Sequence, residues 1–221
     1  MNKILPIFIL IVISCQHAPK QRITERWANG KNKVVLTYDN PNDTANCIRE
    51  FYFENGRLST RGEIHNGKEN GLWEWWYNNG NKKDEAFIED GEYVGQRKHW
   101  REDGTLRQIE IITGKCFGDC CDGKVIFFDD TGIKLIEYSQ KNGKWNGEGL
   151  GFFKNGKIKR RFTYVNGKKQ GVNYECYPNG VISAEGVYID DIEEGKWTLR
   201  DSTGQISGFQ EYKNGKIVAG N

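Results

Sequence analysis

The 221-residue chain carries 32 Lys and Arg against 30 Asp and Glu, a net charge of +2, with no long block of one sign. This balance lacks the basic footprint of a nucleic-acid binder, so no nucleic-acid partner is expected. Twenty-seven glycines, 13% aromatic residues and a single methionine indicate many turns between short aromatic strands and argue against a helical bundle.

The first 14 residues have the pattern of a secretory signal peptide. Lys3 supplies the positive charge, and the apolar run 4–13 is shorter than the roughly 20 residues that a membrane-spanning helix needs. The run ends in Val12-Ile13-Ser14-Cys15, which resembles the bacterial lipobox. The resemblance implies cleavage after residue 14 and acylation of Cys15. The alternative is an ordinary signal peptide with an incidental cysteine, and both interpretations export the protein.

Residues 15–26 are predicted to be the lipidated cysteine and a polar tether. Two or more acyl chains anchor a protein stably, so we expect a lipid-anchored protein of the cell envelope. Gln16 follows the cysteine, which resembles the outer-membrane sorting class of enteric bacteria. Residues 27–46, with Asn29-Gly30 and the apolar run 34–38, are predicted to cap the first edge of the segment that follows.

Glycines recur at a fixed spacing from residue 47 onward. Two columns advance by 24 residues at each step except one step of 28, and a third column keeps the same phase, with Asp191 in place of one glycine. The first column closes turns and comprises Gly56, Gly80, Gly104, Gly132, Gly156, Gly180 and Gly204. The second comprises Gly71, Gly95, Gly123, Gly147, Gly171 and Gly195, and the third Gly67, Gly91, Gly143, Gly167 and Gly215. Seven units are therefore predicted over 47–218: 47–70, 71–94, 95–122, 123–146, 147–170, 171–194 and 195–218.

Each unit is predicted to hold two short strands. Aromatic runs such as Phe51-Tyr52-Phe53 and Trp75-Trp76-Tyr77 precede the first turn, and another apolar position follows eight residues after the turn glycine. Asn-Gly pairs bounded by such runs indicate hairpins, because Asn and Gly accept the positive φ of a tight turn. The sequence therefore predicts an all-β fold, an elongated antiparallel meander of tandem 24-residue β-hairpin repeats.

The segment 71–80, Gly-Leu-Trp-Glu-Trp-Trp-Tyr-Asn-Asn-Gly, followed by an aromatic strand and Asp90-Gly91, resembles a known repeat. It is similar to the MORN repeat variant of bacterial YwqK-type antitoxin proteins, and the similarity extends over about 47–218. The seventh unit departs from the pattern at 200–203, which suits a terminal cap. The resemblance implies an elongated all-β array that serves as a binding or scaffolding surface.

The chain lacks the motifs of common catalytic and metal sites. Glycines at 147–151 have the look of a phosphate loop, but the repeat explains Gly147 and no helix pattern follows. The three histidines, His17, His65 and His99, have no histidine neighbour and fall at different repeat phases. We therefore expect no catalytic residue, no metal and no cofactor.

The single four-residue expansion falls in unit 95–122. It contains three thiols, those of Cys116, Cys120 and Cys121. A local disulfide, a soft-metal site and idle thiols are the alternatives; export favours the disulfide, and the spacing is not a standard zinc pattern. The insertion is predicted to protrude as a loop over about 113–122 and to present Phe117 as a contact residue.

Four tryptophans, Trp73, Trp75, Trp76 and Trp100, are concentrated in two adjacent units. Side chains alternate along a strand, so Trp73 and Trp75 should share one face while Trp76 lies on the other. In one interpretation these rings pack on neighbouring repeats. In the other, one row is exposed and forms a binding surface together with Phe117.

The expected function is that of a non-enzymatic, lipid-anchored scaffold, on the outer membrane of the envelope, whose repeat face binds another protein. One alternative is a lipid-anchored antitoxin or immunity-like protein. Another is a glycan- or peptidoglycan-binding module.

Overall fold

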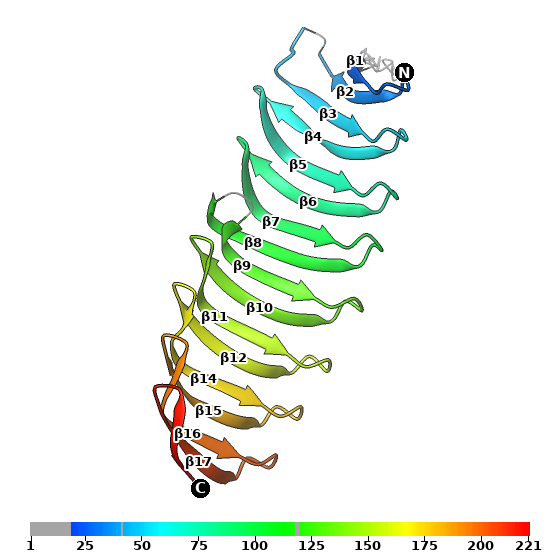
Figure 1. Ribbon diagram of the computed structural model, residues 1–221. Helices are drawn as coiled ribbons and strands as arrows, with labels where there is room; N and C mark the ends of the chain where they lie inside the picture. Colours follow the sequence, from blue (N-terminus) through cyan, green and yellow to red (C-terminus); the bar gives the residue numbers. More distant parts are fainter. Residues whose placement is uncertain (1–18, 41, 118–119) are drawn as a thin grey trace, which may run out of the picture.

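The computed structural model describes residues 19–40, 42–117 and 120–221 as one elongated stack of hairpins (Figure 1). Within these ranges there is no helix, and hence none long and apolar enough to cross a membrane. The described strands are β1 (Lys20–Arg26), β2 (Asn32–Tyr38), β3 (Cys47–Tyr52), β4 (Leu58–His65), β5 (Lys68–Trp76), β6 (Lys82–Glu89), β7 (Glu92–Trp100), β8 (Leu106–Phe117), β9 (Cys120–Phe128), β10 (Lys134–Lys141), β11 (Lys144–Phe152), β12 (Ile158–Val165), β13 (Lys168–Lys169), β14 (Gly171–Cys176), β15 (Ile182–Ile189), β16 (Ile192–Arg200), β17 (Ile206–Lys213) and β18 (Lys216–Gly220).

All strand pairs are antiparallel, and strands that follow one another in the sequence lie side by side in the sheet. The short β13 is the one interruption in the described chain, because β12 pairs with both β13 and β14. The two ends of the described array lie far apart, with β1 at one end and β18 at the other (Figure 1). The predicted all-β antiparallel meander is confirmed.

Two rows of turns connect the strands on opposite sides of the sheet. In the first row the turn glycine closes a tight bond, as where the Gly56 N–H donates to the Phe53 carbonyl at 2.8 Å. In the second row two successive residues have positive φ, for example Asn66 at 51° and Gly67 at 78°. Asp191 occupies one such glycine position at φ 73°, and its carboxylate accepts the N–H of Lys169 at 2.8 Å. That bond helps an aspartate to hold a left-handed conformation.

Side chains of the first row of turns connect each turn to the next. The Tyr77 hydroxyl donates to the Trp100 carbonyl at 2.9 Å, and the Asn79 amide donates to the Glu102 carbonyl at 2.7 Å. The same bonds recur from Tyr177 to Arg200 and from Asn179 to Ser202. The repeated aromatic and asparagine positions therefore satisfy backbone carbonyls of the following unit.

One face of the sheet, here called the packed face, carries the buried side chains of the repeat units. Its central row follows the strand register from Trp73 to Ala86 and onward to Val125. Trp73 is 2% exposed and packs with the buried Ile64 and Ile88. Since side chains alternate along each strand, the neighbours of these residues lie on the opposite face.

Residues 20–26, which were predicted to belong to the polar tether, form strand β1. Arg22 pairs with Leu36 and Ile23 with Val35 in the hairpin that β1 makes with β2. The side chains of β1 are exposed along its whole length. The physical reason is that β2 carries buried valines and would otherwise leave its backbone groups unpaired at the edge, so a charged strand covers it.

The four-residue expansion lengthens a hairpin and does not form the predicted protruding loop. Pairing of β8 with β9 runs to Ile112–Gly123, shifts register, and resumes at Cys116–Cys121 and Phe117–Cys120. The added pairs lie beyond the last pairs that β8 and β9 form with their neighbours, which are Gly95–Ile112 and Gln140–Gly123, and the Cys116 thiol lies 3.9 Å from the Tyr93 carbonyl of β7. The two strands therefore lengthen at the tip of their hairpin, outside the ladders that they form with β7 and β10.

Candidate functional site

The four tryptophans proposed as a binding surface differ in burial: one is buried in the core and three are half-buried. Trp73 is a core residue, and the row that it heads is therefore not an exposed platform. A Cβ atom on Gly62 would lie 2.1 Å from the Trp73 ring, which shows that the ring fills the space above this glycine. Trp75 lies beside it, with ring centroids 6.0 Å apart, and packs against the same cluster. Trp76 and Trp100 are half-buried.

The expanded unit contains a disulfide between Cys116 and Cys121. The bond closes the lengthened hairpin across a register pair of β8 and β9. The side chains of Phe117 and Cys120 are outside the described part of the structure, as are the acylation candidate Cys15 and the tether histidine His17.

The face opposite the packed face carries an apolar patch made of Leu72, Phe87 and Ile111. These side chains are 36%, 51% and 39% exposed. Leu72 and Phe87 are direct cross-strand partners on β5 and β6, and Ile111 lies on β8, with β7 between. Each residue of the patch adjoins a residue of the packed row in sequence, so alternation along the strand would have indicated it.

A polar hollow of about 470 Å³ lies on the packed face of β6, β7 and β8. Its lining comprises Tyr77, Lys83, Asp84, Arg97, His99, Trp100, Arg107, Gln108 and Glu110. Strand register brings the lining together. Asp84 lies opposite His99, His99 lies opposite Gln108, and Arg97 lies opposite Glu110.

His99 connects the two carboxylates of the polar hollow. Its Nδ1 is hydrogen-bonded to Asp84 Oδ1, and its Nε2 lies 3.6 Å from Glu110 Oε1. The Gln108 amide donates to the same Glu110 oxygen at 2.5 Å, and Arg97 Nη1 lies 4.0 Å from Oε2. Burial alone would lower the pKa of His99, but the interactions with Asp84 and Glu110 outweigh it and raise the pKa above the ordinary 6.5. Protonated His99 therefore compensates charge between two acids.

At the floor of the hollow, the buried atoms Nε2 of His99 and Oε2 of Glu110 make no hydrogen bond within the described residues, and the Glu110 side chain is only 9% exposed. A buried polar atom without a partner costs about 1–3 kcal/mol. Asn173, 1% exposed on the same face, provides the contrast: its Oδ1 accepts from the Thr163 N–H at 2.9 Å and its amide donates to Gly171 at 2.8 Å. The array can thus satisfy the polar atoms of a fully buried side chain, as it does for Asn173.

Sequence reasoning treated His99 as an isolated histidine because its two partners come from β6 and β8, the strands on either side of its own. Asp84 and Glu110 are 15 and 11 residues away, which matches no local motif. Pairing residues outward from the Asp90-Gly91 turn would have placed Asp84 near His99. The register shift between Ala86 and Phe87 displaces a simple count of this kind, so the exact pairing needed the structure.

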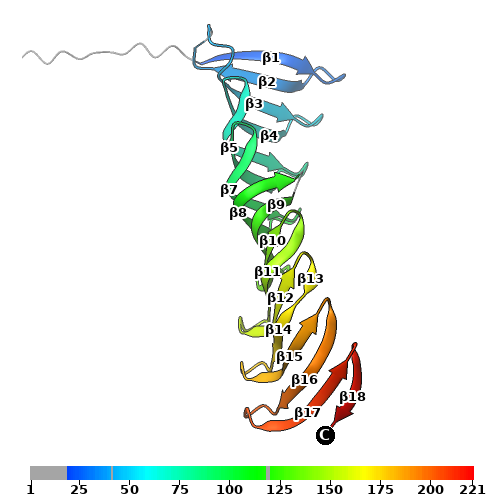
Figure 2. The same cartoon turned by 90° about the vertical axis from the view of Figure 1, so that its left-hand side faces the viewer.

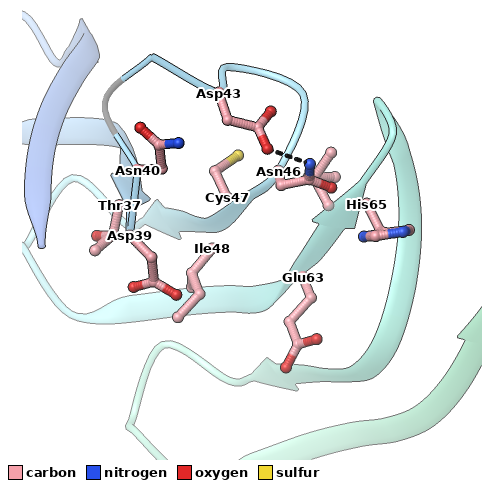
Figure 3. Close-up of a pocket in the computed structure, with 10 residues that line it drawn as sticks. Thr37, Asp39, Asn40, Asp43, Asn46, Cys47, Ile48, Glu63 and His65 are labelled. Atoms are coloured by element: carbon pink, nitrogen blue, oxygen red, sulfur yellow. Dashed lines mark hydrogen bonds between the residues drawn. The ribbon is translucent and has the colours of Figure 1, made fainter.

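A second hollow of about 340 Å³ is lined by Asp39, Asn40, Asp43 and Asn46 together with residues of strands β3 and β4 (Figure 3). The Asn46 amide donates to Asp43 at 2.6 Å, and the hydrogen bond lowers the pKa of this carboxyl. Burial raises the pKa of the Cys47 thiol, which favours the unreactive protonated form. Asp43 also accepts the Ala45 N–H at 3.1 Å, so its carboxylate stabilises the conformation of its own segment.

Among the described residues, no group of three His, Cys, Asp or Glu side chains is arranged to hold a metal ion.

Comparison with known proteins identifies the repeat. The model of the MORN repeat variant matches residues 69–90 and 145–166, which cover the β5–β6 and β11–β12 hairpins. MORN repeats are present in this chain. They point to a repeat scaffold or binding module. No curated protein matches the chain. Among solved structures, a porin-like protein from Bacteroides uniformis is similar at a TM-score of 0.24 and 8% identity, over 89% of this chain and 90% of that one.

Proposed function

We propose that this MORN-repeat chain is a non-enzymatic lipoprotein of the cell envelope, on the outer membrane, and that its sheet binds another protein. The apolar patch of Leu72, Phe87 and Ile111 carries the proposal. Large apolar side chains clustered on a surface mark interaction sites, whereas single ones need no explanation. Phe87, at 51% exposure, is the natural anchor of such a contact.

Charged groups border the apolar patch on the same face. Lys82 forms ion pairs with Glu74 at 2.6 Å and Glu85 at 2.8 Å, and Lys98 reaches Glu85 at 3.3 Å. An apolar centre with a charged border is the usual anatomy of a protein–protein interface. The lengthened hairpin rises next to this area, since Ile111 pairs with Lys124 at its base.

The partner test is photo-crosslinking in intact cells from a reactive residue placed at Gln96, which pairs with Ile111 within the apolar patch. The double variant Leu72→Ser, Phe87→Ser should lose the cross-linked protein, because it removes the apolar centre. Val172 is the repeat equivalent of Leu72 and is 54% exposed, so Val172→Ser is a matched control that should keep the partner. Equal capture by both variants would contradict the proposal. A captured toxin that is inactive while bound would establish the immunity-like alternative.

The anchor is tested separately at Cys15. Replacing Cys15 with Ser should move the protein from the membrane fraction to the soluble fraction, because acylation needs the thiol. The N-terminal peptide of the wild type should carry the mass of the acyl chains. Unchanged fractionation together with an unmodified N-terminal mass would exclude lipidation.

A further inference from the structure

We propose that the polar hollow is a binding site for a carboxylated sugar unit. The site lies on the packed face, whereas the apolar patch lies on the opposite face, so the inference goes beyond the proposed protein contact. A chain with both sites could hold a protein on one side of the sheet and an acidic glycan on the other.

The floor of the hollow needs a ligand that both donates and accepts hydrogen bonds. Glu110 Oε2 is an acceptor, and Nε2 of protonated His99 is a donor. Both atoms are buried and make no hydrogen bond within the described residues, and their charged neighbours, Arg97 Nη1 at 4.0 Å and Glu110 Oε1 at 3.6 Å, lie beyond hydrogen-bond distance. A sugar hydroxyl both donates and accepts, so neighbouring hydroxyls on one ring can serve both atoms. Tyr77 adds an aromatic ring to the lining, against which the C–H face of a sugar can pack.

The mouth of the hollow needs a negative charge. Lys83 and Arg107 line the hollow with exposed side chains. Each is the extra residue at a register shift: Trp75 pairs with Asp84 and Trp76 with Lys82, which leaves Lys83 unpaired, and Arg107 is left unpaired in the same way. A carboxylate at this level would meet both cations while the ring reaches the floor.

Charge separates a carboxylated sugar from other ligands. A cation would be repelled by Lys83 and Arg107 at the mouth. A phosphate of higher charge would approach the carboxylates of Asp84 and Glu110, and a neutral sugar would leave the two cations unused. The mixed pattern, with cations outside and a donor–acceptor pair inside, therefore fits one carboxylate on a polyhydroxylated ring.

The other repeats do not reproduce this site. The position of Glu110 is taken by Gly62, Ala86 and Tyr138 in units before and after it. The position of His99 is taken by Trp75 and Phe127. Lys159 is the repeat equivalent of Lys83 and lies 5.9 Å from the Phe153 ring, just as Lys83 lies 5.9 Å from the Tyr77 ring, but it has no comparable floor.

The test is calorimetric titration of the full chain with trigalacturonate, the neutral galactose trisaccharide and inorganic phosphate. We expect one saturable site for the acidic trisaccharide and at least about tenfold weaker binding of the other two, since a tenfold change is the scale of one lost charged contact. Monomeric galacturonate separates a free sugar acid from a glycan chain as the preferred form of the ligand.

Variants make the assignment specific. Glu110→Gln, and separately the pair Lys83→Ala, Arg107→Ala, should each weaken binding about tenfold or more. Lys159→Ala should leave it unchanged, and thermal melting shows that each variant is folded. The proposal is overturned if trigalacturonate gives no saturable binding, if phosphate binds equally well, or if Lys159→Ala weakens binding as much as the Lys83, Arg107 pair. None of these results depends on the apolar patch, so the protein-binding proposal stands or fails separately.

Discussion

Glycine serves two different physical purposes among the residues of this chain. Gly67 and its equivalents provide positive φ for tight turns, as the value of 78° shows. Gly62 and Gly186 instead provide space, because a Cβ on either would lie 2.1 or 2.2 Å from the ring of Trp73 or Trp197. Each of these two tryptophans thus depends on one small residue on the neighbouring strand.

Gly62→Ala is expected to destabilise the fold by about 1–3 kcal/mol, since the added methyl group collides with a ring that is already buried. Gly149→Ala is the matched control, because its Cβ would meet neighbours at an ordinary 3.6 Å. Urea denaturation measures both. The packing argument for Trp73 would be wrong if the two variants lost the same stability.

His99 gives stability a pH dependence. Its pKa in the folded chain is raised above 6.5 by Asp84 and Glu110 against the effect of burial, while Arg97 opposes the shift. The proton is therefore held more tightly in the folded state, so the stabilisation is complete below about pH 6.5 and is lost as pH rises through the folded pKa. The difference in unfolding free energy between wild type and His99→Gln should shrink from pH 5.5 to 8.5. His65→Gln is the histidine-loss control, and a difference that grows with pH would contradict the expectation.

At the level of single residues, the sequence predicted the turns correctly but not the residues of the polar hollow. The turn glycines could be placed because one residue type and one spacing identify them. Trp73 could not be assigned between core and surface, because the answer depends on Gly62 one strand away. The polar hollow depends on side chains from β6, β7 and β8 and on two register shifts, which no local pattern records.

Among the elements, the lengthened β8–β9 hairpin is the largest departure from the period. Cys116 and Cys121 close it over a sequence separation of 5 residues. Such a short ring restricts the unfolded chain modestly, so Cys116→Ser should cost on the order of 2 kcal/mol or less in the loop-entropy model. Removing four residues to restore a 24-residue unit should likewise preserve the strand signal in circular dichroism. Loss of the cooperative melting transition in either variant would show that the hairpin tip supports the whole sheet.

Strand β1 was missed for a reason that also explains its role. Its sequence, Lys-Gln-Arg-Ile-Thr-Glu-Arg, is charged and carries no glycine of the repeat, and these features led to the prediction of a tether. An edge strand benefits from such charge, because its exposed backbone groups would otherwise invite another strand. The charged residues that protect the edge therefore also remove the alternating apolar pattern by which a strand is predicted.

For the whole molecule, stability should be close to a sum over units and their interfaces. Deleting one complete unit, 147–170, joins equivalent positions of β11 and β14 and should leave a folded, shorter array. Deleting only 147–158 removes one strand direction, so the later strands would have to reverse. Circular dichroism and urea denaturation should show a cooperative fold in the first case and a disrupted one in the second. Equal loss of structure in both would refute the modular description.

The antiparallel meander itself was predictable because three glycine columns repeat the same information along the chain. Redundancy of this kind tolerates local exceptions, such as Asp191 in a glycine position. Surface chemistry is not redundant in that way. The side chains of the apolar patch and the polar hollow are not set by the repeat, because the positions of Phe87 and Glu110 carry other residue types in other units, so the periodicity that establishes the fold carries no information about them.

The strands lie across the long axis of the array (Figure 1), and the two ends of the described chain lie at opposite ends of it (Figure 2). A force that separates these ends therefore acts on the hydrogen bonds of one strand pair at a time and peels the sheet like a zipper. A released unit of 24 residues would exchange two strand spacings, about 10 Å, for about 80 Å of extended chain. Under tension the protein would therefore extend one unit at a time, in steps of similar length.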